Sequence, residues 1–359
     1  MDDGTAEAPG DTVGGTGDGS VSGSVGGSPT LDEVARLAGV SRATASRAIN
    51  GGRRVSARAQ EAVDDAVRRL GYSPNPAARS LVTRRTDSVA LVVPEPDERV
   101  FSDPFFARTL HVVTRALSER DLQVVLLIAR PGDEEQRMLR YLRNRHIDGA
   151  IVVSHHRSDS LADHLAAIGL PSAFIGRPWT SADRVSYVDT DNVAGARDAT
   201  RLLIDRGCRR IGTITGPSDM TAGADRLQGW HEAMAAAGLP TDAAALGDFT
   251  DAGGAAACER LLAAHPDLDG LMVASDLMAA GALRVLSAAG RRVPDDIAVV
   301  GYDDLGIAER TDPPLTTLRN PIGEMAEEAA HLLLGQLDGG SALPRRVVFP
   351  PTMVRRTSA

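Results

Sequence analysis

From residue 88 onward, short apolar segments alternate with longer segments of helical periodicity, and this pattern leaves the chain few possible folds. Apolar runs without polar residues at alternate positions are typical of parallel strands buried on both faces. The strand candidates are residues 88–93, 123–128, 149–154, 172–175, 210–215, 270–274 and 297–301. Helical segments between them include 106–120, 133–144, 192–206, 226–237 and 279–289. The alternation predicts a parallel α/β architecture, and its length of about 270 residues predicts two lobes.

The segment that begins the chain has a different composition. Residues 1–29 contain nine glycines, five acidic residues and no basic or aromatic residue. Such a segment cannot bury enough apolar surface to offset its chain entropy, so we expect it to be disordered. It lacks the basic and apolar regions of a secretory signal, and no apolar run in the chain is long enough to span a membrane. We therefore expect a cytoplasmic protein.

The net charge of −9 argues at first against a nucleic-acid partner, but the charge is unevenly distributed. Between Thr30 and Arg85 the chain has eleven arginines against five acidic residues, a local charge of +6. A small basic module is thus joined to a large acidic remainder. The chain has no lysine, which excludes phosphate-loop and Schiff-base lysine chemistry, and its two cysteines match no metal or disulfide pattern.

The basic module has the signals of three short helices. Thr30 and Glu33 form a capping box, Gly39 suits a helix end, and Ser41 suits the N-cap of a second helix. A third helix is expected to start after Ser56 and to stop at Gly71. Two short helices around a glycine-containing turn, supported by a third, predict a helix-turn-helix. The alternative is a plain three-helix domain whose arginines form a solvated face.

The module and the segment after it resemble the LacI/GalR family of bacterial repressors. The residues that carry the resemblance are TLDEVARLAGVSRATASRAIN and RRVSARAQEAVDDAVRRLGYSPNPAARSL. In the second stretch Asn75 and Pro76 can begin one short helix, about residues 75–82, which is too short to be stable without a partner. The resemblance implies a helix-turn-helix domain at 30–83 and a ligand-binding core at 87–359. The lobes are expected at 87–178 with 316–340, and at 179–315 with 341–359.

The resemblance also implies how DNA is bound. It places Arg42, Ala43 and Arg47 where family members read base edges. Positions that hold phosphates or flank the groove are matched by Thr44, Ser46, Asn50, Arg54 and Ser56. Leu81 matches a hinge leucine that wedges into the minor groove at the operator centre, although it could instead pack the linker onto the core. Two hinges must meet, which implies a homodimer on a near-palindromic double-stranded operator.

Polar residues follow several predicted strands, where open α/β sheets bind their ligands. The resemblance makes the core similar to periplasmic sugar-binding proteins, which have two doubly wound parallel α/β lobes with a ligand cleft between them. It places Arg226 and Asp276 at positions that hold sugar hydroxyls and Phe249 at a position that stacks on the ring. The other candidates are Phe106, His155, Arg177 and Asp303. Each has a structural alternative: Asp276 could cap a helix, Arg226 could form an internal ion pair, Phe106 could be a core residue and His155 an exposed loop residue.

These features predict a transcriptional repressor whose operator affinity is changed by a small sugar in the cleft between the lobes. The effector is expected to shift the lobes, separate the hinges and weaken DNA binding. A nucleoside or purine co-repressor is the alternative, although Met220 lies where purine-binding relatives more usually have a polar or basic residue. A solute-binding protein and a sugar-processing enzyme are further alternatives. No nucleophile elbow, metal motif or dinucleotide fingerprint supports catalysis, so we expect no cofactor and no metal.

Overall fold

The computed structural model describes residues 29–50, 55–73, 85–130, 132–340 and 343–359. The chain divides into two compact units, Met1–Arg84 and Arg85–Ala359. The predicted hinge helix at 75–82, with Leu81, lies outside the described residues, as does Arg54. Among the helices that are described, none is long and apolar enough to cross a membrane.

Within residues 29–50 and 55–73, the first unit has three helices, α1 (Leu31–Leu37), α2 (Arg42–Ile49) and α3 (Ala57–Leu70). Their starts follow the predicted caps, because Thr30 and Glu33 form the capping box and the Ser41 and Ser56 hydroxyls accept backbone hydrogen bonds from their own helices. The small core of this unit is formed by Val34, Ala35, Ala45, Ala48, Val63 and Ala66. The helix-turn-helix prediction is confirmed.

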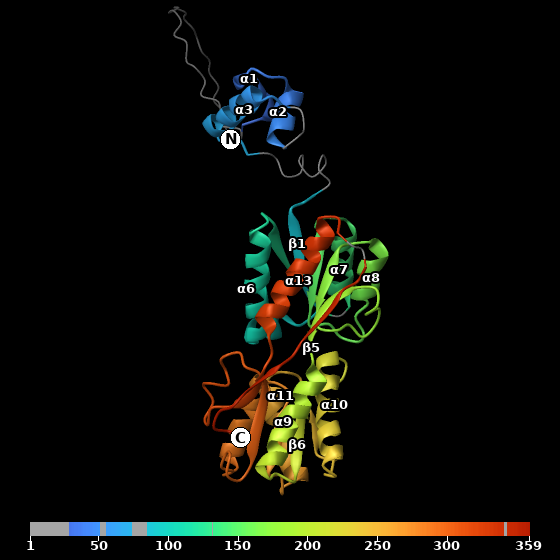
Figure 1. Cartoon of the computed structure of the whole chain (residues 1–359), viewed down its shortest axis with the longest axis vertical. Coiled ribbons are helices and arrows are strands. Elements are labelled where there is room, and N and C mark those ends of the chain that lie inside the picture. The colour runs from blue at the N-terminus through green and yellow to red at the C-terminus, as the bar shows by residue number, and fades with distance from the viewer. Residues whose placement is uncertain (1–28, 51–54, 74–84, 131, 341–342) are drawn as a thin grey trace, which may run out of the picture. The chain divides into compact units, whose positions relative to one another are not determined.

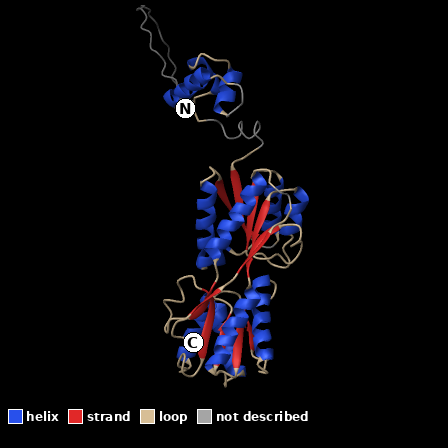
Figure 2. Cartoon of the chain, viewed as in Figure 1, coloured by secondary structure: helices blue, strands red, loops and turns tan. Residues whose placement is uncertain are grey.

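The second unit has two lobes, each built on a six-stranded sheet (Figures 1 and 2). The first sheet runs in the order β2 (Gln123–Ile128), β1 (Ser88–Val93), β3 (Gly149–Val153), β4 (Ser172–Ile175), β5 (Ser186–Thr190) and β11 (Arg346–Phe349). The second runs in the order β7 (Ala244–Leu246), β6 (Ile211–Thr215), β8 (Gly270–Val273), β9 (Ala298–Asp303), β10 (Thr316–Arg319) and β12 (Thr352–Val354). All paired strands are parallel except β10 and β12, so the parallel α/β prediction is confirmed.

Helices cover both faces of each sheet (Figure 2). The helices of the first lobe are α5 (Asp97–Ser102), α6 (Pro104–Ser118), α7 (Asp133–Arg143), α8 (Leu161–Ile168) and α13 (Ile322–Leu337). Those of the second lobe are α9 (Asn192–Arg206), α10 (Thr221–Ala236), α11 (Asp251–Ala264) and α12 (Asp276–Ala288). Alternate residues of one strand therefore face different cores: Leu91 packs with α6 and α13, while Ala90 and Val92 pack with α7.

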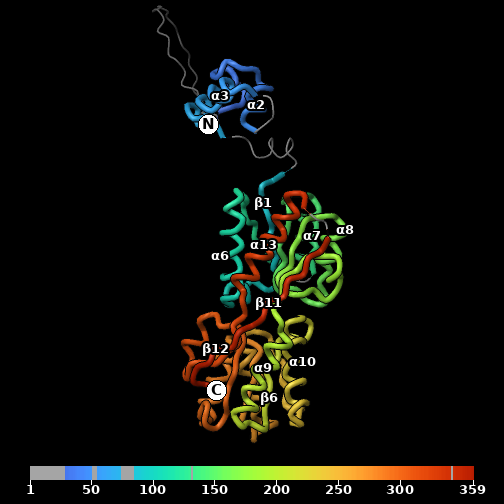
Figure 3. The backbone as a smooth tube through the Cα atoms, viewed as in Figure 1, coloured from blue at the N-terminus to red at the C-terminus, as the bar shows by residue number. Residues whose placement is uncertain are grey.

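The lobe boundaries differ from those expected. The predicted first lobe ended at 178 and resumed at 316, but β5 and β11 belong to the first sheet and β10 to the second. The chain therefore crosses between lobes after β5, after β10 and between β11 and β12 (Figure 3). The cause is local, because β5 has the sequence SYVDT, in which polar residues interrupt the apolar run by which buried strands are recognised.

Candidate functional site

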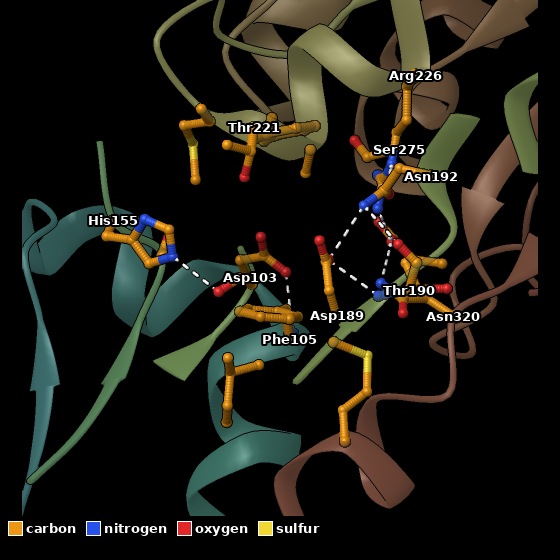
Figure 4. Close-up of a pocket in the computed structure, with 18 of the residues that line it drawn as sticks. Asp103, Phe105, His155, Asp189, Thr190, Asn192, Thr221, Arg226, Ser275 and Asn320 are labelled. Atoms are coloured by element: carbon orange, nitrogen blue, oxygen red, sulfur yellow. Dashed lines mark hydrogen bonds and ion pairs between the residues drawn. The ribbon is translucent and has the colours of Figure 1, made fainter. Parts of the chain in front are cut away.

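A cavity lies between the two lobes, at the carboxyl ends of the parallel strands, and encloses about 690 Å³ of empty space, open solvent included. The first lobe contributes Arg99, Asp103, Phe105, Ser154, His155, Ile175, Gly176, Asp189, Thr190 and Met325. The second contributes Asn192, Met220, Thr221, Ala222, Arg226, Phe249, Ser275, Asp303 and Asn320. Figure 4 shows side chains from both lobes directed into the same space.

Arg226 is held by the second lobe in one orientation. It extends from α10, and its Nε donates to Asn192 Oδ1 at 2.9 Å while Nη1 donates to the Ala274 carbonyl at 2.5 Å (Figure 4). Nη2 reaches Asp303 Oδ1 at 3.4 Å, and the guanidinium lies over the Tyr302 ring, 3.6 Å from its centroid. The whole side chain is buried. The network therefore holds the positively charged guanidinium at the cavity wall, with its remaining N–H groups available to a ligand.

Three carboxyl groups line the cavity, Asp103, Asp189 and Asp303. Burial raises the pKa of Asp103, although the carboxylate caps α6 by accepting from the Phe105 N–H at 2.9 Å. Burial raises the pKa of Asp189 to about 6, and it also raises that of Asp303 to about 6 against the opposing charge of Arg226. A ligand with several hydroxyl donors would supply the hydrogen bonds that these ionised groups lose on leaving water.

Apolar side chains form the rest of the wall. Phe249 and Met220 come from the second lobe, and Phe105, Ile175 and Met325 from the first. Gly216 lets the Phe249 ring approach the backbone, since a Cβ there would lie 2.1 Å from the ring. Phe249 and Asp303 both have positive φ, at 63° and 113°, a backbone conformation that is costly for residues other than glycine and is found at ligand sites. The cavity thus combines an aromatic face with a polar rim.

His155 contributes a neutral imidazole from the first lobe. Its Nε2 lies 3.1 Å from the Gly176 carbonyl, which can only accept, so Nε2 carries the proton. Burial lowers the pKa of His155 to about 4. The ring is therefore uncharged at neutral pH and presents no cation to a ligand.

The exposed face of α2 carries the other group of predicted side chains. Arg42, Ala43 and Arg47 are exposed, whereas Ala45 and Ala48 face the core of the unit. The Arg47 guanidinium makes a hydrogen bond to the Ala43 carbonyl of its own helix at 3.1 Å, and Arg42 lies 3.3 Å from the exposed Asp32. Both interactions are solvated and easily exchanged for contacts with bases or phosphates.

Comparisons with known proteins agree with this arrangement. Residues 30–75 match the family of bacterial regulatory proteins of the lacI family, and residues 200–359 match a periplasmic binding protein-like domain. The HTH-type transcriptional regulator CelR of Thermobifida fusca is 49% identical over 333 residues, which cover 92% of this chain and 98% of that protein. This chain belongs to the LacI family.

Other members of the LacI family are also similar to this regulator. The ribose operon repressor of Escherichia coli K12 is 34% identical over 92% of this chain and 99% of its own length. A solved CelR–cellobiose complex has 47% identity and a TM-score of 0.74, with coverage of 92% of this chain and 100% of that one. The lac repressor dimer bound to operator and an anti-inducer shares the fold, with a TM-score of 0.81 at 24% identity over 92% of this chain and 98% of that one.

Four of the seven predicted ligand residues of this LacI-family chain line the cavity, namely Arg226, Phe249, His155 and Asp303. Phe106 does not, because α6 turns it into the core of the first lobe while Phe105 faces the cavity. Arg177 forms an ion pair with Asp225 of α10 at 2.6 Å and is likewise not part of the cavity wall.

Asp276 also lies away from the cavity surface, and it is not the helix cap either. The cap of α12 is Ser275, whose hydroxyl accepts from the Met278 N–H at 3.2 Å. Asp276 is 1% exposed, and its two oxygens accept from Thr317 Oγ1 at 2.6 Å and from the Asp304 N–H at 2.7 Å. In this structure the Asp276 carboxylate therefore links α12, β10 and the residue after β9, and its contact with a sugar stays a prediction.

Several cavity residues were missed by the sequence analysis. Asp189 and Asn192 flank the first crossing between the lobes, and Asn320 lies in the second. Arg99 comes from the short α5, which was not predicted. The polar stretch Asp189-Thr-Asp-Asn192 could have indicated these site residues. It is recognisable as the end of a strand only if β5 is predicted to be a strand.

The predicted DNA-contacting residues that are described belong to α2, to its C-cap and to the N-cap of α3. Thr44, Ser46 and Asn50 are half-buried, and the Asn50 amide donates to the Ser46 carbonyl at 2.8 Å. Ser56 is exposed, but its hydroxyl accepts from the Ala59 N–H at 3.3 Å as the cap of α3. The DNA contacts of these residues stay predictions.

Proposed function

We propose that this LacI-family regulator is a homodimeric operator-binding repressor whose DNA affinity is changed by a neutral, hydroxyl-rich disaccharide, with cellobiose as the first candidate. The observation that carries the proposal is the interlobe cavity, which is lined by three carboxylates, by the buried Arg226 and by the aromatic side chains of Phe105 and Phe249. The resemblance to CelR supports the choice of disaccharide, since CelR has been solved with cellobiose. The protein would act in the cytoplasm, where bacterial operators are.

The charges of the cavity favour neutral sugars over anionic ones. Asp103, Asp189 and Asp303 line it, whereas its two guanidinium groups already contact carboxylates, Arg226 with Asp303 and Arg99 with Glu95. An anionic sugar placed about 4 Å from an unpaired carboxylate would lose about 1–4 kcal/mol, depending on the local dielectric. Sugar acids and sugar phosphates should therefore bind at least about tenfold more weakly than the parent sugar.

The same walls disfavour a purine co-repressor. A purine presents several ring acceptors, which would face carboxylates that can only accept. Met220 lines the cavity beside Thr221 and offers no strong hydrogen bond to a base edge. Hydroxyl groups of a sugar can instead donate to the carboxylates and accept from Arg226 at the same time.

On the DNA side, we propose that α2 enters the major groove with Arg42, Ala43 and Arg47 toward the base edges. An exposed arginine on a short-chained helix face can bind guanine O6 and N7 in a bidentate manner. We propose that Leu81 acts as a minor-groove wedge and Arg54 as a phosphate contact. The relatives are regulators, and we assign this chain no catalytic step.

The test is isothermal titration of the full-length protein with cellobiose, glucose, cellobionate and adenosine. The expected result is saturable binding of cellobiose, with cellobionate at least about tenfold weaker and no heat from adenosine. Tighter binding of cellobionate than of cellobiose, or binding of adenosine alone, would contradict the proposed effector class.

A further inference from the structure

A second connection between the lobes lies outside the cavity, at the loop that joins β6 to α10. Asp219 of this second-lobe loop receives three hydrogen bonds from the first lobe. Its carboxylate accepts from His156 Nδ1 at 2.9 Å, and its backbone carbonyl accepts from the Arg157 N–H at 2.8 Å and from Trp179 Nε1 at 2.5 Å. The loops after β3 and β4 thus both form hydrogen bonds with Asp219 of the second lobe.

His156 also has a partner on its other ring nitrogen. Nε2 lies 3.0 Å from Oε1 of Glu95, a carboxylate that is 2% exposed. Carboxylates at both nitrogens can only accept, so both nitrogens must carry protons and the ring is an imidazolium. Burial opposes that charge, but hydrogen bonds and charges from Glu95 and Asp219 raise the pKa of His156 to about 9.

Glu95 joins His156 to the wall of the cavity. The same Oε1 atom accepts from Ser154 Oγ at 2.6 Å and from Arg99 Nη1, and both Ser154 and Arg99 line the cavity. Burial opposes ionisation of Glu95, yet the His156 hydrogen bond and the Arg99 charge lower its pKa. A ligand that touches Arg99 or Ser154 therefore acts on the group that fixes His156.

Arg99 itself extends from the first lobe toward the second. Its guanidinium carbon lies 5.4 Å from the centroid of the Phe249 ring, and Nη1 is 3.9 Å from Met220 Sδ. Its Nε is buried and has no hydrogen-bond partner among the described residues, which leaves one donor without an acceptor. Met220 is the neighbour of Asp219, so the cavity wall and the Asp219 connection meet in the same loop.

We propose that His156 is a positioning residue that couples occupation of the cavity to closure of the lobes, by tying the Glu95–Arg99–Ser154 wall to Asp219. This inference rests on the proposed effector binding, and it names His156 as the residue that transmits the effect of the bound effector. The Asp219 bond can form only when the lobes approach, so a bound sugar that orders Arg99 and Ser154 would favour the closed arrangement.

The coupling requires the proton on Nδ1. Charged or titratable groups around His156 are Glu95 and Arg99 on one side, Asp219 on the other, and His155, Arg157 and Asp159 in its own loop, where Asp159 accepts from the His156 N–H at 2.5 Å. Loss of the Nδ1 proton leaves a lone pair facing the Asp219 carboxylate. Sugar affinity should therefore be constant between about pH 7 and 8 and fall as pH rises through about 9.

The experiment compares full-length wild type, His156→Gln, Asp219→Ala, the His156→Gln/Asp219→Ala double variant and Asp225→Ala by titration with cellobiose at pH 7, 8 and 9.5. The glutamine NH2 group can donate to Glu95, but the amide oxygen then faces Asp219 and cannot donate a hydrogen bond to it. Both His156→Gln and Asp219→Ala should weaken cellobiose binding about tenfold and abolish the decline at high pH, and the double variant should lose no more than either single one. Asp225→Ala breaks the Arg177 ion pair, a matched contact between lobes, and should keep the alkaline decline.

A measurement without ligand accompanies this one. NMR of histidine-labelled protein should show His156 as an imidazolium at pH 8 in the wild type, and its pKa should fall in Asp219→Ala. A neutral His156 at pH 8, or variants with wild-type affinity and an unchanged alkaline decline, would overturn the coupling. Failure of the wild type to bind cellobiose would count against the proposed effector instead, and the NMR result would still decide the state of His156.

Discussion

The polar side chains of α2 and those of the cavity are held in opposite ways. On α2, Arg42 and Arg47 are exposed, and among the described residues they bind a surface carboxylate and a carbonyl of their own helix. In the cavity, Arg226 is buried and its donors are directed by three groups from three different segments of the chain. The α2 surface can adapt to DNA at little cost, whereas the cavity is preorganised and depends on residues that are distant in sequence.

Among the substitutions that test this difference between α2 and the cavity, Arg226→Ala should have the largest effect. Arg226→Ala removes the partner of the buried Asp303 and the donors to Asn192 and Ala274, so unfolding free energy should fall by about 3–5 kcal/mol. Cellobiose affinity should fall at least about thirtyfold. Urea unfolding and titration calorimetry measure the two effects.

A second substitution separates the two effects at Arg226. Adding Asp303→Asn to Arg226→Ala removes the uncompensated charge, so stability should recover in part while sugar binding does not. Recovery of sugar binding in the double variant would show that Arg226 only neutralises Asp303.

The substitution Asp276→Ala should have the next largest effect. It distinguishes a residue that only joins buried segments of the protein from one that binds the ligand. Asp276→Ala leaves the Thr317 hydroxyl and the Asp304 N–H without their acceptor, which should cost about 2–4 kcal/mol of unfolding free energy. Cellobiose affinity, measured under conditions where the variant is folded, should stay within about twofold of the wild type. Loss of binding by a stable variant would return Asp276 to the ligand site.

Arg47 tests the adaptable surface. Arg47→Ala should cost about 1–3 kcal/mol of specific operator binding, because one bidentate contact with guanine is lost, while stability and cellobiose binding stay unchanged. Arg68→Ala on α3 removes an exposed arginine that pairs with Asp65 and serves as the matched control. Equal losses for both variants on cognate and random DNA would mean that Arg47 contributes charge alone.

The smallest expected effect is the acidic pH dependence of the cavity. Asp189 and Asp303 have pKa values raised to about 6, so their ionisation opposes folding above pH 6 and this penalty disappears as pH falls toward 4. Sugar hydroxyls favour the ionised forms, so cellobiose affinity should change in the other direction and fall below pH 6, by at most about tenfold per pH unit for each group.

Titration calorimetry between pH 5 and 7 measures this dependence. Asp303→Asn should reduce the slope. A dissociation constant that does not change over this range would contradict a role for the two carboxylates in binding.

The contrast between the two regions also explains what could be predicted from sequence. The first unit follows from local signals, because the caps at Thr30, Ser41 and Ser56 and the turn at Gly39 each act within a few residues. The parallel sheets were predictable from apolar runs such as 88–93 and 149–153. These features depend on neighbouring residues alone.

The cavity depends on contacts that neighbouring residues do not determine. Phe105 and Phe106 are adjacent and aromatic, and only the packing of α6 against α13 decides which one faces the cavity. Asp189, Asn192 and Asn320 become site residues because the chain crosses between lobes beside them, and the crossings depend on the strands β5 and β10, which are too short and too polar to recognise. Asp276 matches a position that holds sugar hydroxyls in the family, whereas in this structure its carboxylate is buried and accepts hydrogen bonds from Thr317 and from the Asp304 N–H.

One titration tests whether a neutral disaccharide in the cavity controls operator binding. An operator fragment is first selected from random DNA with the full-length protein, labelled with a fluorophore and saturated with protein, and cellobiose is then added while anisotropy is recorded. We expect a saturable change in operator affinity at cellobiose concentrations that match its calorimetric dissociation constant, and no change with Arg226→Ala. Calorimetric binding of cellobiose by the wild type without any change in operator affinity would rule out control of operator binding by the disaccharide.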